Sequence, residues 1–183
     1  MAEVGTSAEI RYDRTSIALH WVTAVLIVLL WVIGQLIDDF PRGPPRVAAR
    51  SVHITLGVTL LFVLLGRMAW RASAGRRLPL AHPGWPGYLA RTAHVVLYFL
   101  GAATLVLGLA NVWVRGDSYF GLFKVPKFDP GNDHLQDTVE DLHAILANSL
   151  LVVAGLHAAI ALVHHFVLRN GVLRRMLPGG SAK

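Results

Sequence analysis

The chain has 183 residues, of which 54% are hydrophobic and 15% charged, a composition too apolar for an ordinary soluble domain and typical of a membrane protein. It contains no cysteine, which excludes disulfides, thiolate-ligated iron–sulfur clusters and cysteine nucleophiles. The formal charge of +6 does not indicate nucleic-acid binding, because the basic residues flank apolar segments instead of forming one patch.

Four apolar segments follow one another along the chain, and about 20 apolar residues suffice to cross a bilayer. The predicted spans are residues 17–37, 51–68, 92–114 and 142–168, between a polar tail of residues 1–16 and a basic tail of residues 169–183. Acidic residues and prolines end the first span. The second span is short, and we expect Arg50 and Arg67 to extend their charged groups towards the membrane surface.

An even number of spans places both termini on the same side of the membrane. Most of the lysines and arginines outside the spans lie on that side, and most of the acidic residues lie on the other. The positive-inside rule therefore predicts that both termini are cytoplasmic. The predicted fold is all-α, a transmembrane four-helix bundle that is embedded in the lipid bilayer.

Histidine is costly inside a membrane, so several histidines in apolar spans indicate a function. In the fourth span, His143 and His157 are 14 residues apart and lie on nearly the same helix face, roughly 21 Å apart along the axis. His164 follows on that face seven residues later. Small residues separate these histidines, namely Ala147, Ala154 and Ala161. This pattern leaves room for a flat, bulky group.

Depth in the membrane sorts four histidines into two pairs. His20 and His157 lie towards the cytoplasmic side and form the inner pair, whereas His53 and His143 lie towards the opposite side and form the outer pair. Two ligands at each of two levels is the arrangement that two bis-histidine b haems need, because iron takes one imidazole on each porphyrin face. Such iron has no vacant position, which favours transmembrane electron transfer over oxygen binding.

Two other interpretations of the histidines stay open. A single membrane histidine is more often a hydrogen-bonded polar residue of the core than a ligand. The histidines could also serve a transporter for a divalent metal, but the spans lack the carboxylates that would balance the charge of such an ion.

The chain resembles the bacterial cytochrome b561 family, in its short, four-helix, di-haem form. The matching segments are residues 19–21 at the start of the first span, His53 with Gly57, residues 94–98, residues 143–165 and the tail residues 173–178. The resemblance implies two b haems with the inner and outer pairs as axial ligands, and a place in the bacterial inner membrane.

Within that family, the chain most resembles the stand-alone members that oxidise superoxide outside the cell membrane and pass the electrons to ubiquinone. The alternative is a cytochrome b subunit that carries electrons between a partner dehydrogenase or hydrogenase and the quinone pool. The sequence contains no long extramembrane segment on which a large partner would dock, which favours the first interpretation.

Basic residues near the outer pair are candidates for the guidance of superoxide. These are Arg46, Arg50, Lys124 and Lys127, whose positive charge would attract an anion. Arg50 could instead pair with a haem propionate. The two lysines could equally be solvated loop residues.

Reduction of a quinone requires protons as well as electrons, so titratable or hydrogen-bonding groups are expected beside the inner pair. His164 is one candidate, and its alternative is an interfacial polar residue. Ser16, four residues before His20, is a second candidate. His94 could contact a propionate or the quinone, or only mark the polar start of the third span.

Overall fold

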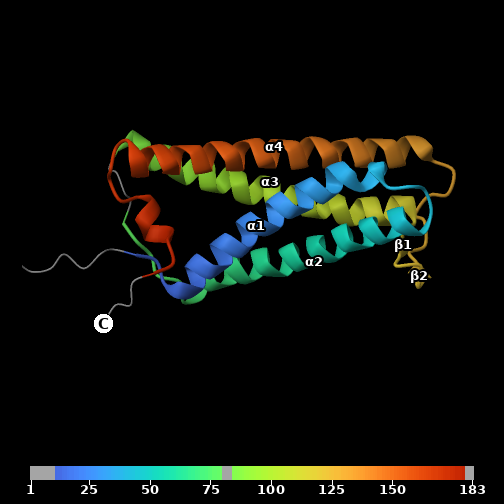
Figure 1. Cartoon of the computed structure of the whole chain (residues 1–183), viewed down its shortest axis with the longest axis horizontal. Helices are drawn as coiled ribbons and strands as arrows, with labels where there is room; N and C mark the ends of the chain where they lie inside the picture. The colour runs from blue at the N-terminus through green and yellow to red at the C-terminus, as the bar shows by residue number, and fades with distance from the viewer. Residues whose placement is uncertain (1–10, 80–83, 180–183) are drawn as a thin grey trace, which may run out of the picture.

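The computed structural model describes residues 11–79 and 84–179, and four long helices dominate it (Figure 1). The helices are α1 (Arg14–Leu36), α2 (Pro44–Ser73), α3 (Trp85–Arg115) and α4 (Asp133–Phe166). Each is long and apolar enough to cross a membrane. The predicted all-α transmembrane four-helix fold is therefore confirmed.

The helices extend beyond the predicted spans at several ends. Helix α2 begins at Pro44, where a proline in the first turn sacrifices no hydrogen bond. Helix α4 begins at Asp133, and the Asn132 side chain caps it by accepting a 2.9 Å hydrogen bond from the Leu135 amide. Hydropathy locates the apolar part of a helix, whereas capping residues locate its first turn. The start of the predicted span therefore differs from the start of the observed helix.

Both ends of the described chain meet at one end of the bundle (Figure 1). The Tyr12 amide donates a 3.1 Å hydrogen bond to the Arg175 carbonyl, just before the end of the short helix η2 (Leu173–Met176). We call this the terminal end. The opposite loop end carries the short helix η1 (Ile37–Asp39) and an antiparallel hairpin of β1 (Ser118–Tyr119) and β2 (Phe123–Lys124). That the terminal end is cytoplasmic stays a prediction.

The bundle consists of two helical hairpins, because α1 packs mainly on α2 and α3 mainly on α4. A small apolar core joins Leu26 and Leu30 of α1 to Leu60 of α2, and Leu105 of α3 packs against it. Contacts between the two hairpins are fewer than the contacts within each. The seam between the hairpins is therefore the natural place for a large group.

The carboxylate of Asp13 links the start of α1 to the end of α2 at the terminal end. It accepts hydrogen bonds from the Ser16 amide and hydroxyl, from the Trp70 indole at 2.9 Å and from the Arg76 amide at 3.0 Å. Burial raises the pKa of Asp13, but these hydrogen bonds outweigh burial and hold the pKa below its ordinary value. The ionised carboxylate therefore stabilises the fold, and this contribution is lost as the pH falls through the lowered pKa.

Replacing Asp13 with alanine is expected to destabilise the protein by about 1 kcal/mol at neutral pH, because the N-cap of α1 and its links to α2 are lost. The unfolding midpoint of detergent-solubilised protein measures the effect, and Asp39→Ala, at an exposed residue, is the control. The difference between parent and Asp13→Ala should shrink only well below about pH 4. Equal midpoints at neutral pH would contradict the proposed role.

Candidate functional site

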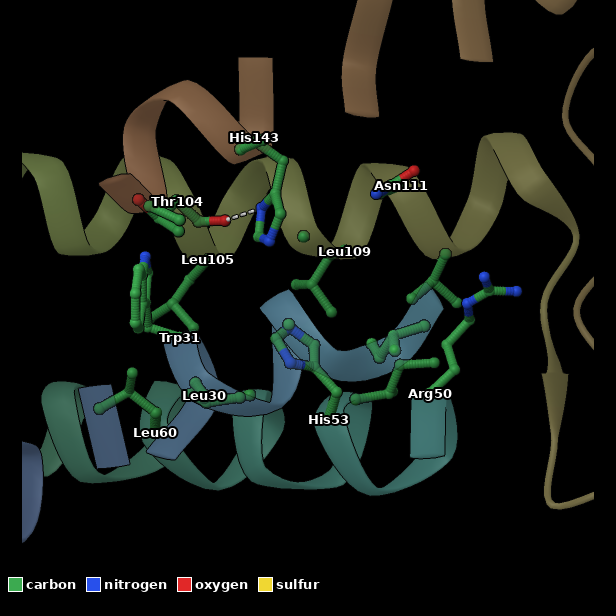
Figure 2. A pocket seen from close by; sticks show the side chains of 18 of the residues that line it. Leu30, Trp31, Arg50, His53, Leu60, Thr104, Leu105, Leu109, Asn111 and His143 are labelled. Atoms are coloured by element: carbon green, nitrogen blue, oxygen red, sulfur yellow. Dashed lines mark hydrogen bonds between the residues drawn. The ribbon is translucent and has the colours of Figure 1, made fainter. Parts of the chain in front are cut away.

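A cavity of about 240 Å³ lies in the seam between the two helical hairpins. All four helices line it, and His53 of α2 and His143 of α4 point towards each other across it (Figure 2). The centroids of these two rings are 6.3 Å apart. The structure thus brings the predicted outer pair together at one cavity.

The spacing of the outer pair suits a metal held between two imidazoles. Nitrogen ligands bind a metal at about 2 Å, so two imidazoles on opposite faces of one iron have centroids roughly 6 Å apart. His143 Nδ1 donates a 3.0 Å hydrogen bond to the Thr104 carbonyl, which leaves the Nε2 lone pair available (Figure 2). The residues of the outer pair therefore fit a bis-histidine haem.

Two glycines give the histidine rings of the outer pair their room. A Cβ atom at Gly108 would lie 3.1 Å from His143 Cε1, and one at Gly34 would lie 3.4 Å from His53 Cε1. Both glycines line the cavity. Larger residues at these positions would displace the rings, so the backbone of α1 and α3 forms part of the site.

The predicted inner pair also comes together, nearer the terminal end. The ring centroids of His20 of α1 and His157 of α4 are 6.5 Å apart, which again suits one metal between them. The guanidinium of Arg67 donates to His20 Nδ1 at 3.1 Å, so in this arrangement His20 Nε2 carries the proton. Binding of a metal at His20 Nε2 requires that this contact open and the ring change its tautomer.

A third histidine lies beside the inner pair. The ring of His94, from α3, is 5.2 Å from that of His157, and its Nδ1 donates a 2.6 Å hydrogen bond to the Ala90 carbonyl. Arg67 lies over the ring of Tyr98, one turn further along α3. His94 thus lies at the level of the inner pair, and its role there stays a prediction.

The loop end of the cavity is polar. Asp117, which is only 8% exposed, lies 3.3 Å from Arg50 and 3.7 Å from Arg115, and Arg115 also pairs with Glu140 at 2.6 Å. All four side chains line the cavity. Burial raises the pKa of Asp117, the two arginines lower it, and the net pKa lies above its ordinary value.

Sequence reasoning missed Arg115, Asp117 and Glu140 as site residues. A usable signal was present, because Arg115 directly follows the third span and Glu140 lies two residues before the start of the fourth. Both positions lie at the loop end, where the outer pair was expected. Which of the charged residues there would face the cavity depends on how the chain turns after α3.

Three of the four predicted guidance residues lie outside the cavity lining. Arg46 donates to the carbonyls of Phe40 and Asp38 and pairs with the Asp38 carboxylate at 3.3 Å. Lys127 lies 3.7 Å from Asp133, and Lys124 is exposed on β2. Arg50 is the one predicted cation that the structure brings to the cavity.

Two of the three residues predicted for quinone or proton chemistry have other partners. The Ser16 hydroxyl donates a 2.7 Å hydrogen bond to Asp13, and His164 Nδ1 contacts the side-chain amide of Asn170. His94 is the one that the structure brings against a predicted ligand, His157.

The chain is similar to known proteins over nearly its whole length. The family described as prokaryotic cytochrome b561 matches residues 11–179. The probable superoxide oxidase CybB of Yersinia pestis is 33% identical over 92% of this chain and 96% of its own length. Cytochrome b561 homolog 1 of Escherichia coli K12 is 28% identical over 92% and 97%, and cytochrome b562 of Cereibacter sphaeroides is 25% identical over 91% and 94%.

Proposed function

The chain belongs to the prokaryotic cytochrome b561 family, and from this premise we propose that it oxidises superoxide and passes the electrons across the membrane to ubiquinone. The family implies haem b and a role as a membrane electron carrier. The observation that carries the proposal is the pair of histidines, His53 and His143, that face each other at 6.3 Å across the seam cavity.

We assign the binding of two b haems to the two histidine pairs, whose imidazoles would hold the iron. When bound, the haems would supply one-electron carriers at two depths of the bundle. The chain contributes the pairs His53–His143 and His20–His157, and α4 provides one member of each. His143 and His157 are 14 residues apart, which corresponds to roughly 21 Å along the helix axis.

Superoxide as the donor is supported by the name of the Yersinia pestis relative and by the charges around the outer pair. Each superoxide ion gives up one electron to become O2, so two ions supply the two electrons that one quinone takes together with two protons. Arg50 and Arg115 line the cavity and provide positive charge for the anion. Arg46, Lys124 and Lys127 would add a longer-range field at the same end.

Ubiquinone as the acceptor is assigned to the inner pair. His94 lies against His157 and is the preferred candidate to hydrogen-bond the quinone or to supply a proton. Ser16 and His164 would contribute only after leaving Asp13 and Asn170. In this proposal the terminal end faces the cytoplasm and the bundle lies in the bacterial inner membrane.

The proposal predicts a reduced haem b spectrum with two haems per chain in the purified protein. Superoxide should reduce these haems, and added ubiquinone should reoxidise them. Stopped-flow absorbance in detergent with a superoxide generator measures both steps. Superoxide consumption that does not depend on quinone would contradict the proposal. A dehydrogenase that copurifies with a chain inert to superoxide would support the partner-subunit alternative.

A further inference from the structure

We propose that the hairpin of β1 and β2 docks on lipid at the loop end of the bundle, with Phe120, Leu122 and Phe123 at the boundary between headgroups and acyl chains. This surface lies outside the haem site, and the proposal does not depend on the electron-transfer reaction. It rests on how the hairpin is attached, on its depth along α2 and on its exposed side chains.

The hairpin is attached firmly to the side of α2. The Phe120 amide donates a 2.7 Å hydrogen bond to the hydroxyl of Ser51, a residue with no exposed surface. The hydroxyls of Thr55 and Tyr119 form a second link of 2.8 Å. Figure 1 shows the two strands beside the first turns of α2. The hairpin therefore lies against the bundle instead of projecting freely into water.

These links set the depth of the hairpin in the membrane. Thr55 is the twelfth residue of α2 and two residues beyond His53, so Tyr119 reaches the level of the outer pair. This point is about one helical turn, roughly 5 Å, inside the predicted span that begins at residue 51. A surface at that level meets the interfacial region of the bilayer, where aromatic side chains are enriched.

The side chains of the hairpin suit that environment. Leu122 is 80% exposed and Phe123 58% exposed, which would be unfavourable for a loop surrounded by water. Tyr119 packs against Phe120 at 4.9 Å and against Phe123 at 5.4 Å, so the aromatic cluster is held in place. Lys124 follows, and its long side chain can extend its ammonium to the headgroups.

The turn conformation is also imposed by the attachment. Phe120 has a φ of 49°, in the left-handed region that is unfavourable for a residue with a Cβ. The hydrogen bond from its amide to buried Ser51 holds it there. Gly121, with a φ of 74°, completes the turn without that cost. The exposed apolar side chains are thus fixed features of the fold.

The absence of cysteine allows a direct test, because one introduced cysteine takes one label. Leu122→Cys carries a bimane label in the full-length protein in phosphatidylcholine–phosphatidylglycerol nanodiscs that contain a lipid with a nitroxide on its headgroup. Asp137→Cys, at an exposed polar residue of α4 before the predicted fourth span, is the matched control. We expect at least twofold quenching at position 122 and little at position 137.

A second readout is reaction of the unlabelled cysteines with a membrane-impermeant maleimide. We expect the thiol of Leu122→Cys to react at least tenfold more slowly than the thiol of Asp137→Cys. Equal rates and no quenching at position 122 would overturn the proposal in favour of a water-exposed hairpin. Efficient disulfide cross-linking between two copies of Leu122→Cys, without quenching, would overturn it in favour of a contact between two copies of the chain. Helical content and haem stoichiometry verify that both variants fold.

Discussion

Replacing His143 with alanine is expected to lower the haem content from two per chain to one. The substitution removes one side of the outer pair, whereas the inner pair, about 21 Å away along α4, keeps both imidazoles. The pyridine haemochromogen assay against protein concentration measures the ratio. Dithionite should still reduce the remaining haem, but electron transfer from superoxide to ubiquinone should fall at least a hundredfold.

The matched control for this variant is His134→Ala. His134 is also on α4, but it is exposed in the first turn, and its side chain contacts Thr138. The His134→Ala protein should keep two haems and full activity. A His143→Ala protein that retains both haems would exclude His143 as a ligand. In His157→Ala the remaining haem should be the outer one, and its absorption spectrum should differ from that of His143→Ala.

The spans and the histidine pairing were accessible from the sequence because both depend on regular geometry. Uninterrupted apolar segments identify a membrane helix, and a helix returns to the same face after 14 residues, as from His143 to His157. Successive spans cross the membrane in opposite directions, so the start of the first span lies beside the end of the fourth. The sequence therefore predicts that His20 lies at the level of His157. The structure has both pairs at centroid distances near 6 Å. Their binding of iron stays a prediction.

The polar surroundings of the pairs could not be predicted in the same way. Their positive charge makes Arg46 and Lys127 candidates for the guidance of superoxide, but Asp38 and Asp133 lie close enough to pair with them. The turn after α3 brings Asp117 back to Arg50, 67 positions apart in the sequence, and no local pattern encodes that return.

The face of α3 that points towards the histidine pairs could not be predicted from the sequence for a related reason. His94 is the only histidine of its span, so no second histidine defined the face on which it lies. The Ser16 hydroxyl bonds Asp13, because a serine three residues after an N-cap residue is as well suited to bond that cap as to bind a ligand. The role of a residue that makes a single functional contact can be predicted only when the partner of that contact is known.

Filling the seam cavity is expected to remove the outer haem without removing any ligand. Gly57 lines the cavity one turn after His53, and a Cβ added there meets no atom within 4 Å. Leucine at this position should therefore fold without a clash and should favour the helix by up to about 1 kcal/mol over glycine. Its side chain would occupy the space between the hairpins, so the haem content should fall from two per chain to one.

Gly66→Leu separates this effect from any general effect of leucine in α2. Gly66 is in the same helix, its added Cβ also meets nothing within 4 Å, and it does not line the cavity. It should keep two haems and an unchanged spectrum. Gly57→Leu with two haems would mean that the cofactor lies elsewhere. His143→Ala removes a ligand and leaves the space, whereas Gly57→Leu removes the space and leaves the ligands. Loss of the same haem in both would therefore locate it between His53 and His143.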